Sequence, residues 1–248
     1  MKWYKRIASL ALTCALAFSL LVVPAGASGS SEESTQRADH LASLGLFQGT
    51  GGGYQLDAAP TRIQGLVMLL RLLGLEDEAL ACTEPSPFDD VTWGDNYLSY
   101  AYQNGLTQGT SDHTFSPDNP LDAKSYVTFL LRALGYDDAA GDFTWATALS
   151  FAAQQSMMDA ASATTLAGIS MNRGDMVDLS YAALTCPMKD GSQTLAEKLI
   201  DQGVFTAQAA QSAGVLGSRW TYTYVPYDNS TIDYEVKELA GVTAHVFT

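Results

Sequence analysis

The sequence predicts a mainly helical fold, in which three helix–loop–helix units share one core and a small β-hairpin forms the C-terminal tail. The first observation is a repeated helix ending, "MLLRLLG" at 68–74 and "FLLRALG" at 129–135. The second is a glycine-containing loop that recurs before these helices, and the third is a change to period-two aromatic spacing from Trp220. One helical hairpin cannot bury its own apolar face, whereas three packed together can.

The first 27 residues predict a secretory signal peptide, in which a basic start precedes an apolar run and an A-x-A cleavage site ends at Ala27. A membrane anchor is the alternative, because the run is nearly long enough to span a bilayer. Cleavage removes three of the 13 basic residues and leaves 27 acidic ones, which gives a net charge of −17. Such a surface repels nucleic acid and anionic membranes, so we expect neither as a partner after cleavage.

The units follow one local pattern. Gly45-Leu46 recurs as Gly105-Leu106, and "QGT" occurs in both following loops. The second helices are expected to start at capping residues, of which the first belongs to a near-complete capping box and the others to partial ones: Thr61 with Gln64, Asp122 with Ser125, and Asn172 with Asp175. The expected divisions are a linker at 28–36, repeat one at 37–80, repeat two at 81–137, a degenerate repeat three at 138–206, and a tail of helix and hairpin at 207–248.

Repeat two contains "FDDV" at 88–91, Trp93 and "FSP" at 115–117, whereas repeat one has "TRIQ" at 61–64 and repeat three has "NRGD" at 172–175. This order resembles the S-layer homology (SLH) domain family of bacterial cell-envelope proteins. The resemblance implies a pseudo-threefold bundle of three SLH-like repeats in a secreted protein of a Gram-positive-type cell wall or S-layer. It also implies non-covalent attachment to secondary cell-wall polysaccharide, often acidic, in grooves between neighbouring repeats.

The resemblance implies that the ligand-binding residues are those at the arginine, tryptophan, aspartate and loop positions of the motif. They are Arg62, Arg173, Trp93, Asp90, Gln108, Gly109, Thr110, Gly49 and Trp145. An arginine offers a planar fork that can hold a carboxylate by two hydrogen bonds, and near a helix start it adds to the positive end of the helix dipole. Tryptophan offers a flat face for a sugar ring, and a glycine-rich backbone can approach a ligand closely.

The chain departs from the family pattern once in each repeat. Repeat two has Ala123 in the arginine position, Glu33 stands where repeat one should have tryptophan, and residues 163–166 replace the glycine loop of repeat three. Because no repeat keeps every expected ligand-binding group, a complete groove has to combine groups from neighbouring repeats. We expect Trp93 and the Gln108–Thr110 loop to combine with Arg62 or Arg173.

Structural alternatives accompany these assignments. Trp93 and Trp145 are either ligand contacts or core residues at the start of a helix, and for Trp145 the core position is favoured. Arg62 and Arg173 either bind ligand or form surface ion pairs, and Asp90 is either a site residue or a helix cap. Gly49 and Gly109 are either ligand contacts or turn residues, and the turn is the more common role of such glycines. A second arginine in each helix ending, Arg71 and Arg132, is expected to hold the carbonyls of its last turn.

The tail and the remaining reactive residues complete the sequence-based interpretation. Aromatic residues at 220, 222 and 224, a turn at 226–230 and a second alternating run at 232–236 predict a hairpin that packs on the bundle or binds a protein partner. A degenerate SLH scaffold for protein–protein interaction is therefore the alternative function. Isolated histidines and the lack of any catalytic motif predict no enzyme, cofactor or metal site. Cys82 and Cys186 are either a disulfide or free thiols.

Overall fold

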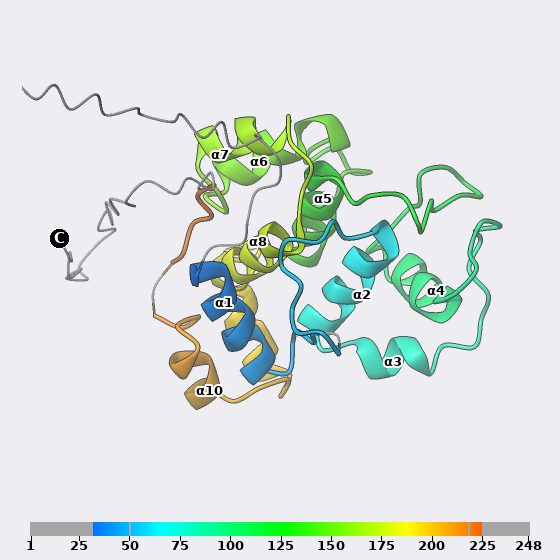
Figure 1. Ribbon diagram of the computed structural model, residues 1–248. Coiled ribbons are helices and arrows are strands. Elements are labelled where there is room, and N and C mark those ends of the chain that lie inside the picture. The colour runs from blue at the N-terminus through cyan, green and yellow to red at the C-terminus, as the bar shows by residue number, and fades with distance from the viewer. Residues whose placement is uncertain (1–31, 50, 218, 225–248) are drawn as a thin grey trace, which may run out of the picture.

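A computed structural model describes residues 32–49, 51–217 and 219–224 of the chain (Figure 1). Within these residues the protein is mainly helical, and its β pairing consists of isolated bridges. The helices are α1 (Glu32–Ser43), α2 (Arg62–Leu72), α3 (Glu76–Leu80), α4 (Asp95–Gln103), α5 (Ala123–Ala133), the 3-10 helix η1 (Trp145–Thr147), α6 (Ala148–Gln154), α7 (Ala160–Leu166), α8 (Arg173–Thr185), α9 (Leu195–Asp201) and α10 (Ala207–Ser212).

The second helices of the predicted units, α2, α5 and α8, contact one another pairwise. The first helix of each unit packs on the second helix of a different unit: α4 packs on α2, η1 and α6 pack on α5, and α1 packs on α8. Figure 1 shows α1 beside α8, although Arg37 of α1 and Asp178 of α8 are 141 residues apart in the sequence. Each unit therefore buries its apolar face against a neighbour, as expected for helical hairpins that cannot form a core alone.

The second helices begin where the capping residues predict. The Gln64 side chain accepts a hydrogen bond from the Thr61 amide at 3.1 Å, and Asp122 caps the first turn of α5. Asn172 and Asp175 each accept the other's amide, at 2.8 and 3.0 Å. The box at Asn172 is therefore complete, and the prediction of a partial one was wrong, because an aspartate at the third helical position reaches back as a glutamate does.

The repeated helix ending has the expected structural role. Its leucines are buried in the shared core, and Gly74 and Gly135 follow α2 and α5 with φ of 66° and 92°. Only glycine adopts this left-handed conformation at little cost, so each glycine ends its helix. Gly74 is also tightly packed, since a Cβ there would lie 2.7 Å from both methyl groups of Val204.

Some sequence-based boundaries need correction. Helix α1 begins at Glu32, inside the range 28–36 that was predicted as linker, because Ser34 and Arg37 bond to Asp178 of α8 and hold this stretch against the bundle. The signal peptide at 1–27 and most of the predicted hairpin lie outside the described residues. In the described part, Tyr222 forms a single parallel bridge with Met158.

The tail and the cysteines answer two questions that the sequence leaves open. Tyr222 is buried with 2% of its surface exposed, so this part of the tail packs on the bundle. Both Cys82 and Cys186 are free thiols. None of the helices within residues 32–49, 51–217 and 219–224 combines the length and apolar character needed to cross a membrane.

Candidate functional site

Two grooves between the helical units collect most of the predicted ligand residues. The Arg62 groove, of about 480 Å³, is lined by Arg62, Thr107, Gln108, Gly109, Thr110, Asn119, Pro120, Asp122, Ser125, Thr128, Phe129, Arg132, Asp138 and Trp145. The Arg173 groove, of about 230 Å³, is lined by Phe47, Gln48, Gly49, Gln64, Val67, Met68, Arg71, Trp93, Tyr97, Arg173 and Met176.

Both grooves are assembled by one rule. In each groove the loop and the second helix come from one unit, the tryptophan comes from the unit that follows it around the bundle, and the arginine comes from the remaining unit. The structure thus places Trp145 and the Gln108–Thr110 loop with Arg62, and Trp93 and Gly49 with Arg173. The predicted combination of Trp93 with the Gln108–Thr110 loop was wrong, because the order of units around the bundle decides which motifs meet.

Arg62 is the first residue of α2, and the loop of the next unit holds it in place. Its Nε donates to the Phe115 carbonyl at 2.9 Å, and the guanidinium lies 4.9 Å from the Phe115 ring centre. Burial lowers the pKa of Arg62, yet an arginine keeps its charge in proteins. In the described part of the chain no carboxylate forms an ion pair with Arg62. Asp122 and Asp90 act on its charge at longer range, so its terminal amino groups are not bound to a described carboxylate.

Arg173 is held in the same way at the start of α8. Its Nε donates to the Tyr54 carbonyl at 2.9 Å, and its guanidinium lies 5.6 Å from the Phe47 ring centre. Burial lowers the pKa of Arg173 as well. No described carboxylate pairs with this arginine either, so the surface ion pairs considered for Arg62 and Arg173 are not formed.

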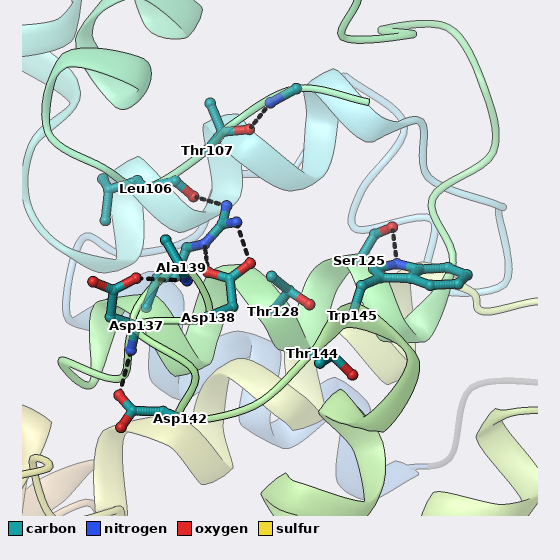
Figure 2. Close-up of polar contacts among 12 residues, drawn as sticks. Leu106, Thr107, Ser125, Thr128, Asp137, Asp138, Ala139, Asp142, Thr144 and Trp145 are labelled. Atoms are coloured by element: carbon teal, nitrogen blue, oxygen red, sulfur yellow. Dashed lines mark hydrogen bonds and ion pairs between the residues drawn. The ribbon is translucent and has the colours of Figure 1, made fainter. Parts of the chain in front are cut away.

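The second arginine of each groove is neutralised. Arg132 donates through Nε and Nη2 to the two oxygens of Asp138, at 2.8 and 2.7 Å, and Nη1 donates to the Leu106 carbonyl at 3.3 Å. Figure 2 labels the two acceptor residues, Asp138 and Leu106. These bonds lower the pKa of Asp138 and keep it ionised. Arg71 pairs with Glu76 at 2.7 Å. Both arginines bind carboxylates that follow their helices, so the expected role in capping the last turn was wrong.

The two tryptophans lie at the groove edges. Trp93 is 47% exposed and Trp145 is 51% exposed, so the core position favoured for Trp145 was wrong. The Trp145 indole Nε1 donates to the Ser125 hydroxyl at 3.2 Å, as Figure 2 shows, and this bond holds the ring beside the start of α5. Lys124 lies 4.9 Å from the centre of the ring. An indole held by one edge and half open to solvent can stack on a ligand.

Asp90 has a different role from either expected one. Its two carboxylate oxygens accept the amides of Phe115 and Ser116, at 2.9 and 2.7 Å. Asp90 is therefore neither a helix cap nor a groove-lining residue. It fixes the loop whose carbonyl in turn fixes Arg62, and its charge is satisfied by backbone donors.

The loop glycines form turns, and they also line the grooves. Gly109 has φ of +77°, and a Cβ there would lie 2.4 Å from the Phe88 ring and 2.6 Å from the Thr114 carbonyl oxygen. Gly49 is less constrained, since a Cβ would approach the Gly53 carbonyl oxygen at 2.9 Å without the positive φ. A side chain at either position would therefore disturb its loop.

Comparisons with known proteins connect this geometry to the cell surface. Residues 87–122 match the S-layer homology domain model. The chain is 30% identical over 216 residues to a cell surface protein of Thermoanaerobacter kivui. The aligned residues make up 82% of this chain and 28% of the relative. It is also 24% identical over 234 residues to a middle cell wall protein of Brevibacillus brevis, and these residues make up 85% of this chain and 22% of that relative.

A third relative, a surface layer protein of Brevibacillus choshinensis, is 31% identical over 101 residues, which is 39% of this chain and 9% of that protein. The chain thus spans a quarter or less of two of these relatives and slightly more of the first. The family match covers the "FDDV" segment, Trp93, α4 and the loop that holds Arg62. The segment 87–122 is therefore similar to the S-layer homology domain.

Proposed function

We propose that this protein is a secreted, non-catalytic cell-envelope protein that attaches to secondary cell-wall polysaccharide through its helical units. The observation that carries the proposal is the pair of grooves that each unite an arginine without an ion-pair partner among the described residues, a half-exposed tryptophan and a glycine loop. The cyclic packing of α1 on α8, α4 on α2 and α6 on α5 supports a pseudo-threefold arrangement of three SLH-like units. The names of the three surface and wall relatives support the location.

The chemistry of the grooves fits an anionic sugar. A guanidinium fixed through Nε still has two terminal amino groups that can hold a carboxylate by parallel hydrogen bonds. The half-exposed indole can cover the apolar face of a sugar ring, while the loop amides and hydroxyls bind its polar edge. Because the chain carries an excess of acidic residues, the two arginines supply local positive potential that the overall charge opposes.

A sedimentation assay with purified cell-wall sacculi tests the proposal. We expect the chain lacking residues 1–27 to pellet with sacculi and to stay in solution when the polysaccharide has been stripped from them. The double variant Arg62→Gln/Arg173→Gln should lose about 100-fold or more in affinity, because each lost charge-assisted hydrogen bond costs roughly 1.5–3 kcal/mol.

The matched control is Lys189→Gln/Lys198→Gln, which removes the same charge outside both grooves. It should pellet as the unsubstituted chain does, apart from a small effect of net charge. Equal pelleting of the arginine variant and the control, or equal binding to stripped sacculi, would contradict polysaccharide attachment through the grooves.

A further inference from the structure

Helix α8 has a face that corresponds to the groove-lining faces of α2 and α5, but on α8 this face is covered by other residues of the chain. Each open groove is lined by the third and sixth residues of its second helix. These are Gln64 and Val67 on α2, and Ser125 and Thr128 on α5. On α8 the same positions are Asp175 and Asp178. Both are buried, and burial raises the pKa of each carboxyl. We call this place, between α8, α1 and residues 157–159, the closed groove.

The three departures from the family pattern converge on the closed groove. By the assembly rule of the open grooves, its loop comes from unit three, its tryptophan position from unit one and its arginine position from unit two. These are the altered loop that contains α7, Glu33 on α1, and Ala123 at the start of α5. Three changes that lie far apart in the sequence thus remove the arginine, tryptophan and glycine loop from one place.

The chain's own segment 219–224 occupies the closed groove. The Tyr222 amide donates to the Met157 carbonyl at 2.9 Å, and the Asp159 amide donates to the Tyr222 carbonyl at 3.0 Å, so the segment pairs with residues 157–159 through a single parallel bridge. The Tyr222 ring is buried, and its hydroxyl donates to Asp175 at 3.0 Å. The tyrosine therefore satisfies the buried carboxylate on the groove floor.

Trp220 extends the contact toward α1. The Arg37 guanidinium lies 3.9 Å from the Trp220 ring centre, and Arg37 also pairs with Asp178 at 3.1 Å. The Trp220 amide donates to the Thr185 hydroxyl at 3.0 Å, and that hydroxyl donates back to the Trp220 carbonyl at 3.0 Å. In Figure 1 the orange segment before residue 224 runs past the start of α1 toward α7. The segment thus bonds to the third unit and stacks on the first.

We propose that the closed groove is a peptide-binding site, converted from the plan of the sugar grooves, and that residues 219–224 latch it shut in the same chain. Alternate side chains anchor the peptide, since Trp220 stacks on Arg37 and Tyr222 enters the floor, and backbone pairing with 157–159 fixes its register. The latch joins unit three to unit one and leaves two grooves open. Only the count of open sugar grooves rests on the proposed function; the peptide site does not.

Amide hydrogen exchange of the chain lacking residues 1–27 tests the latch. We expect protected amides at Asp159 and Tyr222, which donate across the pairing. Tyr222→Ala should raise exchange at Asp159 by more than tenfold while amides of α2 and α5 stay protected. Tyr222→Phe keeps the ring and removes only the bond to Asp175, so it should raise exchange at the same amide about tenfold without loss of the fold.

The peptide RWTYTY, residues 219–224, added to Tyr222→Ala should restore protection at Asp159, whereas RWTATY should not. Tyr102→Ala, at a half-exposed tyrosine outside the closed groove, is the control and should leave Asp159 protected. Fast exchange at Asp159 in the unsubstituted chain, or no response to either Tyr222 variant, would overturn the latch. A dimer that exchanges the segment between chains would overturn its intramolecular form.

Sacculus binding by Tyr222→Ala separates this inference from the proposed function. It should equal that of the unsubstituted chain within about twofold, since the open grooves are unchanged. Appearance of an additional polysaccharide site in this variant would overturn the assignment of the closed groove to peptide. If the unsubstituted chain fails to pellet with sacculi, the proposed function fails, and the exchange experiment still decides the latch.

Discussion

The Arg62 groove and the Arg173 groove share one plan but line it differently. At the third, sixth and seventh positions of the second helix, the Arg62 groove has Ser125, Thr128 and Phe129. The Arg173 groove has glutamine, valine and methionine at these positions, and it encloses about 230 Å³ against about 480 Å³. A common framework can therefore support two sites of different size and polarity, because the anchoring bonds involve backbone carbonyls rather than the lining side chains.

This difference predicts a division of labour. The larger and more polar groove can surround a sugar with hydroxyl partners, and its volume lies within the range of small-molecule sites, whereas the smaller groove falls below that range. We therefore expect the Arg62 groove to supply most of the affinity for the wall polymer and the Arg173 groove to add a weaker second contact.

The largest contrast should appear when the loop glycines are replaced. Gly109→Ala should lower the free energy of unfolding by about 3 kcal/mol, because the left-handed backbone and three contacts shorter than 3.0 Å oppose a Cβ. Gly49→Ala lacks the positive φ and should cost about 1 kcal/mol. Urea denaturation of both variants measures the difference. Equal losses would show that the two loops are equally constrained.

The next largest contrast should be the loss of binding when one of the two arginines is replaced. Arg62→Gln alone should weaken binding to sacculi by about 30-fold and Arg173→Gln by about tenfold, since each variant loses a charge-assisted bond and the smaller Arg173 groove makes the weaker contact. Titration of each single variant with a soluble wall polysaccharide measures the two effects. A larger loss for Arg173→Gln would reverse the proposed order of the grooves.

The carboxylate pairs predict a smaller, pH-dependent contrast. Hydrogen bonds from Arg132 lower the pKa of Asp138, so this stabilisation is complete above the ordinary aspartate pKa and is lost as pH falls through the lowered one. Asp138→Asn should therefore cost about 1 kcal/mol at pH 7 and almost nothing near pH 2.

Glu76→Gln is the matched variant in the other groove. Arg71 also lowers the pKa of Glu76, but the pair is more exposed, with 25% and 20% of the side chains accessible against 9% and 17% for Arg132 and Asp138. The cost at pH 7 should be about half as large and should vanish over the same acidic range. Urea denaturation at both pH values decides, and a cost of Asp138→Asn that persisted near pH 2 would exclude the ion pair as its cause.

The smallest expected effect concerns the groove lining. Thr128→Val should weaken binding about twofold by removing a hydroxyl from the Arg62 groove, and Val67→Thr should leave binding in the Arg173 groove nearly unchanged. Both exchanges keep side-chain shape. Polysaccharide titration is the measurement, and a stronger response to Val67→Thr would mean that the smaller groove binds the more polar part of the ligand.

Local features were predictable from the sequence, whereas the combinations were not. Capping residues and the glycines that end α2 and α5 act through neighbours in the chain, so the pattern located these helices well. The short helix α3 lacks an amphipathic pattern long enough to reveal it. Which motifs meet depends on the order of units around the bundle, so Trp93 was assigned to the wrong loop.

The burial of the tail illustrates the same limit. Ala123, Glu33 and the altered loop of unit three appear in the sequence as unrelated losses in different units. Only the order of the units around the bundle, with α1 packed on α8, assigns their positions to the one groove that Tyr222 occupies. Alternating aromatics predicted extended structure, but the parallel pairing with Met158 needed a partner that no local pattern identifies.

The number of polysaccharide sites per chain tests the central claim most directly. Calorimetric titration with a short fragment of the wall polymer should give two sites for the unsubstituted chain, one for either single arginine variant and none for Arg62→Gln/Arg173→Gln. Three sites in the unsubstituted chain, or undiminished binding in the double variant, would contradict the account of two open grooves and one occupied by the chain itself.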